Sequence, residues 1–304
     1  MNKFTNRDKD VIYKRVTETI LEQLRQGVAP WNMPWIAESG QHGNIVSGKA
    51  YQGLNQLLCW CYCQQNGWTS PHWATFNQIK KKGGKVKKGS KANYITFWKW
   101  YEPKAKKGQS TTEEEKKGYA FLKVYQVFNL EQTTGIEDPT KEKRDPIQAI
   151  DEADQFINRI DADITYGGDR AYYSPKKDII KIPDMDRFID SESFYSTILH
   201  ELGHWTGHVS RLNRFEKSQG FGSVLYAEEE LVAELTSAFL CAHVGISGNL
   251  QHPNYIGSWI KVLENDPKAV VKAATAARKA SNLLISLSEK GSTQTTEEEE
   301  TLAA

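Results

Sequence analysis

Three things are scarce in this sequence of 304 residues: cysteine, long apolar runs and, in the N-terminal half, arginine. Of four cysteines, Cys59, Cys61 and Cys63 fall within one short segment. This spacing suits neither a disulfide framework nor a common zinc pattern, so we expect reduced, apolar packing residues in a cytoplasmic protein. Runs of 18 or more apolar residues are lacking, which argues against a membrane span. The segment from Met1 to Arg25 mixes charges of both signs, which is not typical of an export signal.

The net charge of +1 conceals a division of the chain into two oppositely charged halves. Residues 1–130 contain 21 basic and 9 acidic side chains, a net of +12, which leaves −11 for residues 131–304. The length favours two domains, and an apolar content of 39% is enough to form their cores. We therefore expect a basic domain over 1–135 that binds a polyanion, a second domain over 145–290, and a disordered acidic tail over 291–304.

The hydrophobic patterns predict an α+β protein, with an N-terminal α/β domain containing an antiparallel sheet and a mainly helical second domain with a small sheet. A first helix is expected from Val11 to Leu24. Two aromatic segments around the polar insert Lys104–Lys117 predict a β-hairpin with a long loop. Further helices are predicted over 54–66, 74–82, 147–160, 191–208, 226–244 and 255–289, the last interrupted at Asp266-Pro267. Strands are predicted over 93–101, 118–129, 163–166, 171–174 and 178–182.

The sharpest motif is an HExxH sequence that begins at His200 and ends at His204. Asp190 is placed to cap the helix that carries it. On a helix the two histidines are one turn apart and face the same way, as two ligands of one metal must. Glu201 lies beside them and is the expected general base for activating water. The alternative is a surface helix with two incidental histidines.

A third protein ligand is needed to leave one open position on a catalytic metal. Ser210 occupies the position where one class of HExxH enzymes has a third histidine, which disfavours that class. The helix over 226–244 offers carboxylates instead, and we expect Glu230 to bind the metal, with Glu229 as the register alternative. Glu234, one turn later, is expected to orient a ligand histidine from behind. Imidazole ligands favour Zn²⁺ or another transition metal such as Mn²⁺.

These residues indicate metal-assisted hydrolysis, and activated water suits the hydrolysis of peptide bonds. Tyr226 and His243 are weaker candidates for stabilising an oxyanion, since both are equally typical of packed helix residues. A metal-dependent nuclease is a further alternative, but nuclease sites usually combine clustered carboxylates with hard cations.

The basic half combines lysine with aromatic residues. Alternation in the strand 93–101 places Trp98 and Trp100 on one face, while Tyr119, Phe121, Lys123 and Tyr125 share a face of the partner strand. Aromatic side chains stack on unpaired bases and lysines neutralise phosphates, which is typical of single-stranded DNA binding, although a solvated basic loop is the alternative. Arginines are few and confined to the first helix, which disfavours base-specific contacts. The segment 80–91 supplies Lys80, Lys81, Lys82, Lys85, Lys87, Lys88 and Lys91.

Several motifs, in order along nearly the whole chain, resemble the ArdC family of plasmid antirestriction proteins. The resemblance implies an N-terminal single-stranded DNA-binding domain, shared with conjugative primase proteins, followed by a zincin-like metallopeptidase domain. It also draws attention to Trp31, Trp35, Lys49, Tyr51, Asn55 and Trp73 as DNA contacts. The segments that carry it are 30–35, 48–55, 70–78, 84–91, 200–208 and 226–234.

The resemblance further implies a role in protecting incoming conjugative plasmid DNA from host restriction. We expect a cytoplasmic antirestriction protein that binds single-stranded DNA and carries a gluzincin-like HExxH peptidase centre, with host restriction–modification subunits as a protein target. One alternative is a single-stranded DNA-binding protein whose metal is purely structural.

Overall fold

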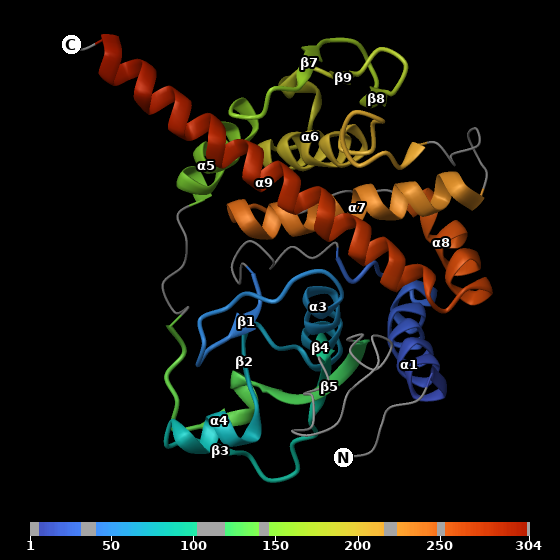
Figure 1. The fold of residues 1–304 in the computed structure, drawn as a ribbon, viewed down its shortest axis with the longest axis vertical. Helices are drawn as coiled ribbons and strands as arrows, with labels where there is room; N and C mark the ends of the chain where they lie inside the picture. Colours follow the sequence, from blue (N-terminus) through green and yellow to red (C-terminus); the bar gives the residue numbers. More distant parts are fainter. Residues whose placement is uncertain are drawn as a thin grey trace, which may run out of the picture.

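The computed structural model has the predicted α+β architecture with two domains (Figure 1). The N-terminal elements, from α1 to β6, contain the larger sheet, and the C-terminal elements, from α5 to α9, are mainly helical with a small sheet. The structure describes residues 6–31, 41–101, 119–139, 146–215, 224–247 and 253–302.

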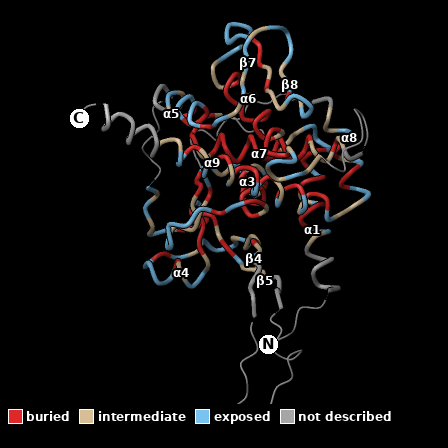
Figure 2. Tube along the Cα trace, turned by 45° about the horizontal axis from the view of Figure 1, so that its top comes forward, coloured by how far each residue is buried: buried red, intermediate tan, exposed pale blue. Residues whose placement is uncertain are grey.

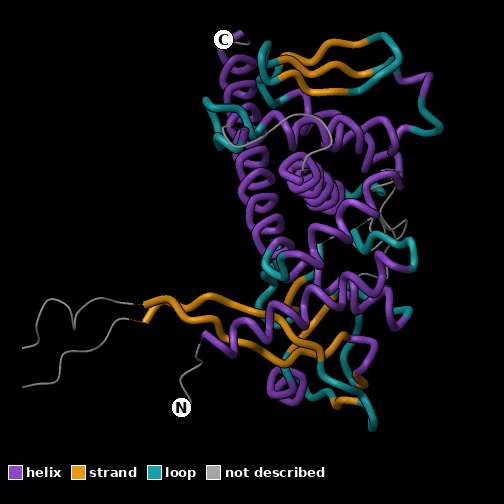
Figure 3. The backbone as a smooth tube through the Cα atoms, turned by 90° about the vertical axis from the view of Figure 1, so that its right-hand side faces the viewer, coloured by secondary structure: helices purple, strands orange, loops and turns teal. Residues whose placement is uncertain are grey.

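A four-stranded sheet with the order β1-β2-β5-β4 forms the centre of the N-terminal domain. β1 (Gly43–Asn44) is parallel to β2 (His72–Ala74), and the other neighbours are antiparallel. β4 (Asn93–Tyr101) and β5 (Tyr119–Asn129) pair along the whole of β4, which confirms the predicted hairpin. Figure 3 shows the outer end of this hairpin projecting away from the rest of the chain. The insert Lys104–Lys117 lies outside the described residues.

Helix α3 (Leu54–Asn66) packs against β4, and the short α4 (Phe76–Lys81) contacts β5. Helix α1 (Asn6–Arg25) packs against α3. After α4, the lysine-rich segment continues into β3 (Lys85–Val86), which pairs with β6 (Thr133–Thr134). α4 and β3 lie at the end of the N-terminal domain that is farthest from the C-terminal helices (Figure 1).

α3 carries three of the four cysteines into the interior. Cys59, Cys61, Cys63 and Cys241 are free and buried. Burial raises the pKa of each thiol, so all four stay neutral. Their predicted role as small apolar packing residues is therefore confirmed.

The C-terminal domain places a three-stranded sheet, with the order β7-β9-β8, over a layer of helices. Its β8–β9 hairpin was predicted, and its turn places Asp178 at a φ of 55°, a left-handed conformation that Asp tolerates better than most residues. The strands are β7 (Asp163–Tyr166), β8 (Tyr172–Ser174) and β9 (Ile179–Ile182). The helices are α5 (Pro146–Asn158), α6 (Ser191–Trp205), α7 (Val224–Val244), α8 (Pro253–Asn265) and α9 (Ala269–Leu302).

The two domains share a hydrophobic cluster. Apolar residues of α1 and α3 pack in one cluster with residues of α7, α8 and α9. Figure 2 shows buried stretches of α3, α7 and α9 meeting in the middle of the molecule. The N-terminal domain therefore packs directly on α7, a helix that carries part of the candidate metal site described below.

The C-terminal end of the chain differs from the expectation. We predicted a disordered tail over 291–304, whereas the backbone of α9 continues as a helix to Leu302. This extension needs no new helix nucleus, and the Glu-rich segment consists largely of residues with good helix propensity. No helix in the described parts of the chain combines the length and the apolarity that a membrane crossing requires.

Candidate metal centre

The HExxH motif lies on α6, whose N-terminus is capped as predicted. Asp190 accepts a hydrogen bond of 2.7 Å from the backbone N–H of Ser193, which satisfies one of the amides left unpaired at a helix start. Phe194, Ile198, Leu199 and Leu202 form the buried apolar side of the helix. This packing holds the histidines in one orientation toward the protein interior.

The glycine of the motif lets α6 approach α7 closely. A Cβ atom on Gly203 would lie 3.1 Å from Cα of Ala233 and 3.3 Å from its carbonyl oxygen, closer than ordinary van der Waals contact. Glu230 precedes Ala233 by about one helical turn, so the close approach brings its carboxylate opposite the histidines.

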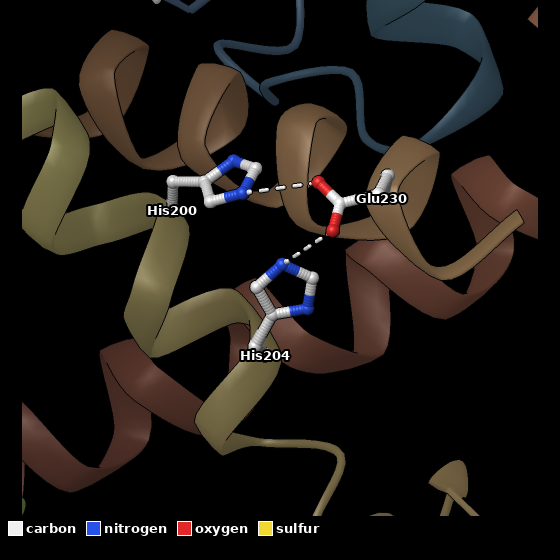
Figure 4. Close-up of side chains that lie close together, drawn as sticks. All are labelled: His200, His204 and Glu230. Atoms are coloured by element: carbon white, nitrogen blue, oxygen red, sulfur yellow. Dashed lines mark ion pairs between the residues drawn. The ribbon is translucent and has the colours of Figure 1, made fainter. Parts of the chain in front are cut away.

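His200, His204 and Glu230 form a compact group of potential metal ligands, with one donor atom from each all within 4.8 Å of one another. The carboxylate of Glu230 points between the two imidazole rings (Figure 4). Its Oε2 lies 3.6 Å from Nε2 of His200, and its Oε1 lies 3.5 Å from Nε2 of His204. The structure therefore places Glu230 in the position predicted for the third ligand.

The donor set fits a divalent metal ion. Two donors at about 2.1 Å from a tetrahedral ion lie about 3.4 Å apart. The two imidazole–carboxylate separations agree with this spacing to a few tenths of an ångström, each through a different oxygen of Glu230, and one donor atom from each residue lies within 4.8 Å of the others. Two imidazole nitrogens and one carboxylate oxygen leave a fourth position for water or substrate.

Glu229, the register alternative, lies on the other side of His204. Its Oε1 is 3.4 Å from Nδ1 of His204, and its carboxylate accepts hydrogen bonds of 2.9 and 2.8 Å from Nε and Nη2 of Arg214. A carboxylate at the distal nitrogen of a ligand histidine sets its tautomer and orientation. We predicted this role for Glu234, which is buried and whose role stays a prediction.

Hydrogen bonds from Arg214 link Glu229 of the candidate metal centre to the C-terminal end of α6. Arg214 donates hydrogen bonds of 2.8 Å to Oγ1 of Thr206 and 2.7 Å to the carbonyl oxygen of Gly203, in addition to those with Glu229. No sequence pattern points to Arg214, because it follows the motif in an irregular segment and no spacing relates it to Glu229.

The charges of the centre perturb several pKa values. Burial opposes protonation of His204, but hydrogen bonds with Glu229 and Glu230 outweigh it and raise the pKa of this imidazole to about 10. Burial likewise favours neutral carboxyl groups, yet hydrogen bonds with His200 and His204 lower the pKa of Glu230, and those with His204 and Arg214 lower the pKa of Glu229. In the metal-free protein His204 is therefore protonated at neutral pH, and metal binding must displace its proton.

The predicted base and two tyrosines lie near this group. Glu201 is 7% exposed, and its negative charge contributes to the raised pKa values of His204 and Tyr255. The hydroxyl of Tyr226 lies 3.4 Å from that of Tyr255, and burial together with hydrogen bonds to Tyr255 and Glu230 raises the pKa of Tyr226. Tyr226 was a weak candidate from sequence, and Tyr255 was missed because only the packing of α8 on α7 brings it here.

An aromatic row continues from Tyr255 into the shared core. Tyr255 stacks on Trp259 at 6.0 Å between centroids, and Trp259 meets Trp31 edge-on at 5.4 Å. Trp31 is 2% exposed, which contradicts the expectation that it contacts DNA directly. His243 packs edge-on against Phe156.

Three further residues proposed as DNA contacts are also interior. Trp73 is fully buried and donates a 2.9 Å hydrogen bond to Nδ1 of His42, whose pKa burial lowers to about 3. Asn55 exchanges hydrogen bonds with the backbone of Thr96, and Tyr51 is buried beside the sheet. These side chains hold the domain together, so the expectation that they contact DNA directly is corrected.

The lysines predicted to contact DNA lie on the surface, unlike the buried Trp73, Asn55 and Tyr51. Trp35 lies outside the described residues, as do the side chains of Trp98 and Trp100. Every lysine predicted to contact DNA is exposed: Lys49, Lys80, Lys81, Lys82, Lys85, Lys87, Lys88 and Lys91.

An aromatic–cationic group does form on the β4–β5 hairpin. Phe97 is 41% exposed and meets the ring of Tyr125 edge-on at 5.5 Å, while Nζ of Lys123 lies 4.8 Å from the centroid of Tyr125. The register places Phe97 opposite Lys123, so these residues share one face of the hairpin. Lys123 and Tyr125 belong to the face that alternation predicted.

His208 takes no part in the group of ligands. Its Nδ1 lies 2.8 Å from Oγ of Ser210 and 3.7 Å from Oδ2 of Asp178 in the β8–β9 turn. Arg211, stacked on Trp205, also pairs with Asp178. The segment after α6 is therefore anchored to the small sheet, as expected for a chain without a third ligand histidine there.

Comparisons with known proteins agree with this arrangement. The family model of the N-terminal domain of anti-restriction factor ArdC matches residues 10–128, and that of the zincin-like metallopeptidases matches residues 151–276. The chain is 35% identical to DNA primase TraC of Escherichia coli over 93% of its length but spans only 28% of that primase. It is 34% identical to the uncharacterized protein y4eC of Sinorhizobium fredii (strain NBRC 101917 / NGR234), covering 88% of this chain and 89% of that protein.

Two crystal structures of the antirestriction ArdC protein from plasmid R388 have the same fold. The metal-free structure is 32% identical, with a TM-score of 0.76, and the match covers 91% of this chain and 98% of that one. The Mn(II)-bound structure is 33% identical, with a TM-score of 0.73 over 91% of this chain and 97% of that one. With the two-domain fold and the divalent metal site, these similarities show that the chain belongs to the ArdC family of antirestriction proteins, with a zincin-like metallopeptidase domain.

Proposed function

We propose that the chain hydrolyses peptide bonds at this centre, with Glu201 as the general base. The observation that carries the proposal is the convergence of two imidazoles and one carboxylate, with Glu201 beside them on α6. When bound, a divalent ion polarises the scissile carbonyl group and acidifies water. Zn²⁺ is the ion we propose, because histidine-rich tetrahedral sites suit it, with Mn²⁺ as the alternative.

In this proposal separate residues bind the metal ion and transfer protons. His200, His204 and Glu230 hold the ion. The carboxylate of Glu201 accepts a proton from the attacking water and delivers it to the leaving amine. Tyr226, which hydrogen-bonds to Glu230 and Tyr255, is the proposed donor to the oxyanion.

Glu201→Gln tests the proposal, with Glu228→Gln on α7 as the matched control. Purified variants are loaded with Zn²⁺ or Mn²⁺, metal content is measured, and cleavage of a peptide library and of restriction–modification subunits is followed by mass spectrometry. We expect Glu201→Gln to retain metal and lose cleavage by at least about 100-fold, since general bases contribute on that order. A Glu201→Gln variant as active as Glu228→Gln would contradict the role of Glu201.

A second candidate, a purely structural metal, is favoured by burial. The side chains of His200 and Glu230 are only 4% and 6% exposed, which suits a closed structural site. If the metal is structural, wild type cleaves nothing in the same library, while metal removal still lowers the midpoint of thermal unfolding. Cleavage that Glu201→Gln abolishes would exclude this candidate.

We also propose that the N-terminal domain binds single-stranded DNA. Its charge of +12 over residues 1–130, the exposed lysines, and the group formed by Phe97, Lys123 and Tyr125 support backbone neutralisation combined with base stacking. Fluorescence anisotropy with labelled oligothymidylate and duplex DNA tests this at several salt concentrations. Equal affinity for duplex, or no binding at low salt, would contradict the proposal.

The biological role that we propose is protection of incoming conjugative plasmid DNA from restriction in the cytoplasm. It rests on the family and on the name and plasmid origin of the similar ArdC protein. Host restriction–modification subunits are the proposed protein target. Conjugation efficiency into restricting and non-restricting recipients, with wild type and Glu201→Gln, measures protection and its dependence on the metal centre. Equal efficiency with and without the protein in the restricting recipient would contradict the role.

A further inference from the structure

Two apolar side chains of the N-terminal domain are exposed near the junction between the turn after β1 and α4. Phe76, the first residue of α4, is 56% exposed, and Val46, in the turn after β1, is 40% exposed. Each lies two residues from a member of a reciprocal amide pair, in which Asn44 and Gln78 exchange hydrogen bonds of 3.0 and 3.2 Å. The pair joins the turn to the start of α4, so the two exposed residues flank one hydrogen-bonded junction.

Hydrogen bonds hold the backbone frame around Phe76. Thr75 and Gln78 form a capping box at the start of α4. Oδ1 of Asn44 accepts hydrogen bonds from the backbone N–H groups of Val46 and Ser47, which fix the turn. β1 pairs with β2 just before α4. A rigid, hydrogen-bonded frame thus presents a large aromatic side chain to solvent, where it adds little to the core.

The sequence segments that contain Val46 and Phe76 carry only positively charged side chains. Lys80 lies four residues after Phe76 and therefore on the same face of α4. Lys49 follows the turn, and both lysines are exposed. No Asp or Glu occurs between Ser39 and Tyr101. A polyanion with stackable rings matches this combination, whereas an apolar protein partner has no use for the lysines.

We propose that the turn 44–49 and α4 form a second contact surface for single-stranded DNA, on which Phe76 stacks against a base while Lys49 and Lys80 contact phosphates. The inference rests on the proposed single-stranded DNA binding and extends it beyond the β4–β5 hairpin. It gives an exposed role to the motif 70–78, several of whose other residues are buried for packing and which Asn44 and Gln78 join to the turn.

The test compares Phe76→Ala, Phe76→Trp and Ile189→Ala in the full chain. Ile189 is 80% exposed in the C-terminal domain and serves as the matched loss of an exposed apolar side chain. Affinity for labelled oligothymidylate is measured by anisotropy, together with thermal unfolding to show that each variant is folded. We expect Phe76→Ala to weaken binding about 5- to 100-fold, as loss of one base stack does, while Phe76→Trp restores it.

The salt dependence separates stacking from charge. Phe76→Ala is expected to leave the slope of log affinity against log salt unchanged, whereas Lys80→Gln reduces it by about one. If wild type binds the oligonucleotide and Phe97→Ala weakens it, but Phe76→Ala binds like wild type, this inference fails and the proposed DNA binding stands. If wild type does not bind, the proposed DNA binding itself fails.

Discussion

Oε1 of Glu229 lies 3.4 Å from Nδ1 of His204, while Oε1 of Glu230 lies 3.5 Å from Nε2 of the same ring. Two neighbouring glutamates of α7 therefore contact opposite nitrogens of one imidazole. Oε2 of Glu230 also lies 3.6 Å from Nε2 of His200, and Glu229 is held by Arg214. We infer from this arrangement that Glu230 binds the metal and that Glu229 orients its histidine ligand.

Glu229→Gln should weaken metal binding without abolishing it. The amide keeps the shape of the side chain but removes the charge that orients His204 and pairs with Arg214, and loss of such a partner costs about 10- to 100-fold in affinity. Competition with a chromogenic chelator measures the affinity for Zn²⁺ and Mn²⁺. Glu230→Ala should bind metal far more weakly still, and Glu228→Gln like wild type. An unchanged affinity in Glu229→Gln would remove Glu229 from the centre.

Metal binding should release protons near neutral pH. The pKa of His204 is raised to about 10, so the metal-free imidazole is protonated below that pH and must lose its proton to bind the ion. The apparent metal affinity should therefore rise with pH between 6 and 8, by about tenfold per unit for one proton released. Titration calorimetry in buffers with different ionisation enthalpies counts the protons. A binding enthalpy that is independent of the buffer would contradict this.

Gly203→Ala should disturb both stability and the metal centre. The added methyl group meets the backbone of Ala233, and overpacking of this kind costs about 1–3 kcal/mol. Urea unfolding and metal content report the two effects. The control is Gly257→Ala, because a Cβ on Gly257 in α8 meets nothing within 4 Å and alanine is the better helix former by up to about 1 kcal/mol. Equal behaviour of the two variants would show that the α6–α7 contact is not tight.

The ion pair between Asp178 and Arg211 should stabilise the protein in a pH-dependent way. The hydrogen bond from Arg211 lowers the pKa of Asp178 below its ordinary 3.8. A carboxyl group with a depressed pKa stabilises the folded state above about pH 4, and this stabilisation disappears as the pH falls through the folded pKa.

Asp178→Asn tests this, since asparagine also tolerates the φ of 55°. Its urea midpoint should be lower than that of wild type at pH 7, and the difference should shrink at about pH 3. Asp169→Asn, at an exposed position, should show no such trend. A difference that is constant with pH would mean that the charge of Asp178 is not responsible.

Trp31→Ala should destabilise the protein rather than weaken DNA binding. The side chain is buried against Trp259 in the core shared by both domains, and truncation of a buried Trp costs about 3–5 kcal/mol. Urea unfolding measures the loss, and oligothymidylate affinity is measured well below the unfolding midpoint. Weakened DNA binding by a variant that unfolds like wild type would restore Trp31 as a DNA contact.

Local patterns predicted most of the elements. Helical periodicity placed α3 and α7 almost to the residue, and alternation placed both strands of the β4–β5 hairpin. His200 and His204 are four residues apart, and on a helix this spacing alone predicts that they share one face. The exception is the tail, whose polar composition predicted disorder where α9 continues.

Relations between distant segments were predicted less completely than the elements themselves. Spacing alone left Glu229 and Glu230 as alternatives, because a run of glutamates has no intrinsic register against another helix. Arg214 and Tyr255 were missed for the same reason. Trp31 and Trp73 were misassigned as DNA contacts because aromatic residues stack on bases and pack in cores with equal ease, and burial alone distinguishes the two uses.

The sequence by itself therefore determined the chemistry that is available: two histidines and a base on one helix, candidate carboxylates on another, and lysines with aromatic residues in a basic half. Only the tertiary structure decided how these residues are used. The contact of Gly203 with Ala233 selects Glu230 for the ligand group, and the core that joins α1 and α3 to α7 moves Trp31 inside. The physical reason is that side-chain periodicity is set within a single element, whereas register, burial and charge pairing arise only when elements pack together.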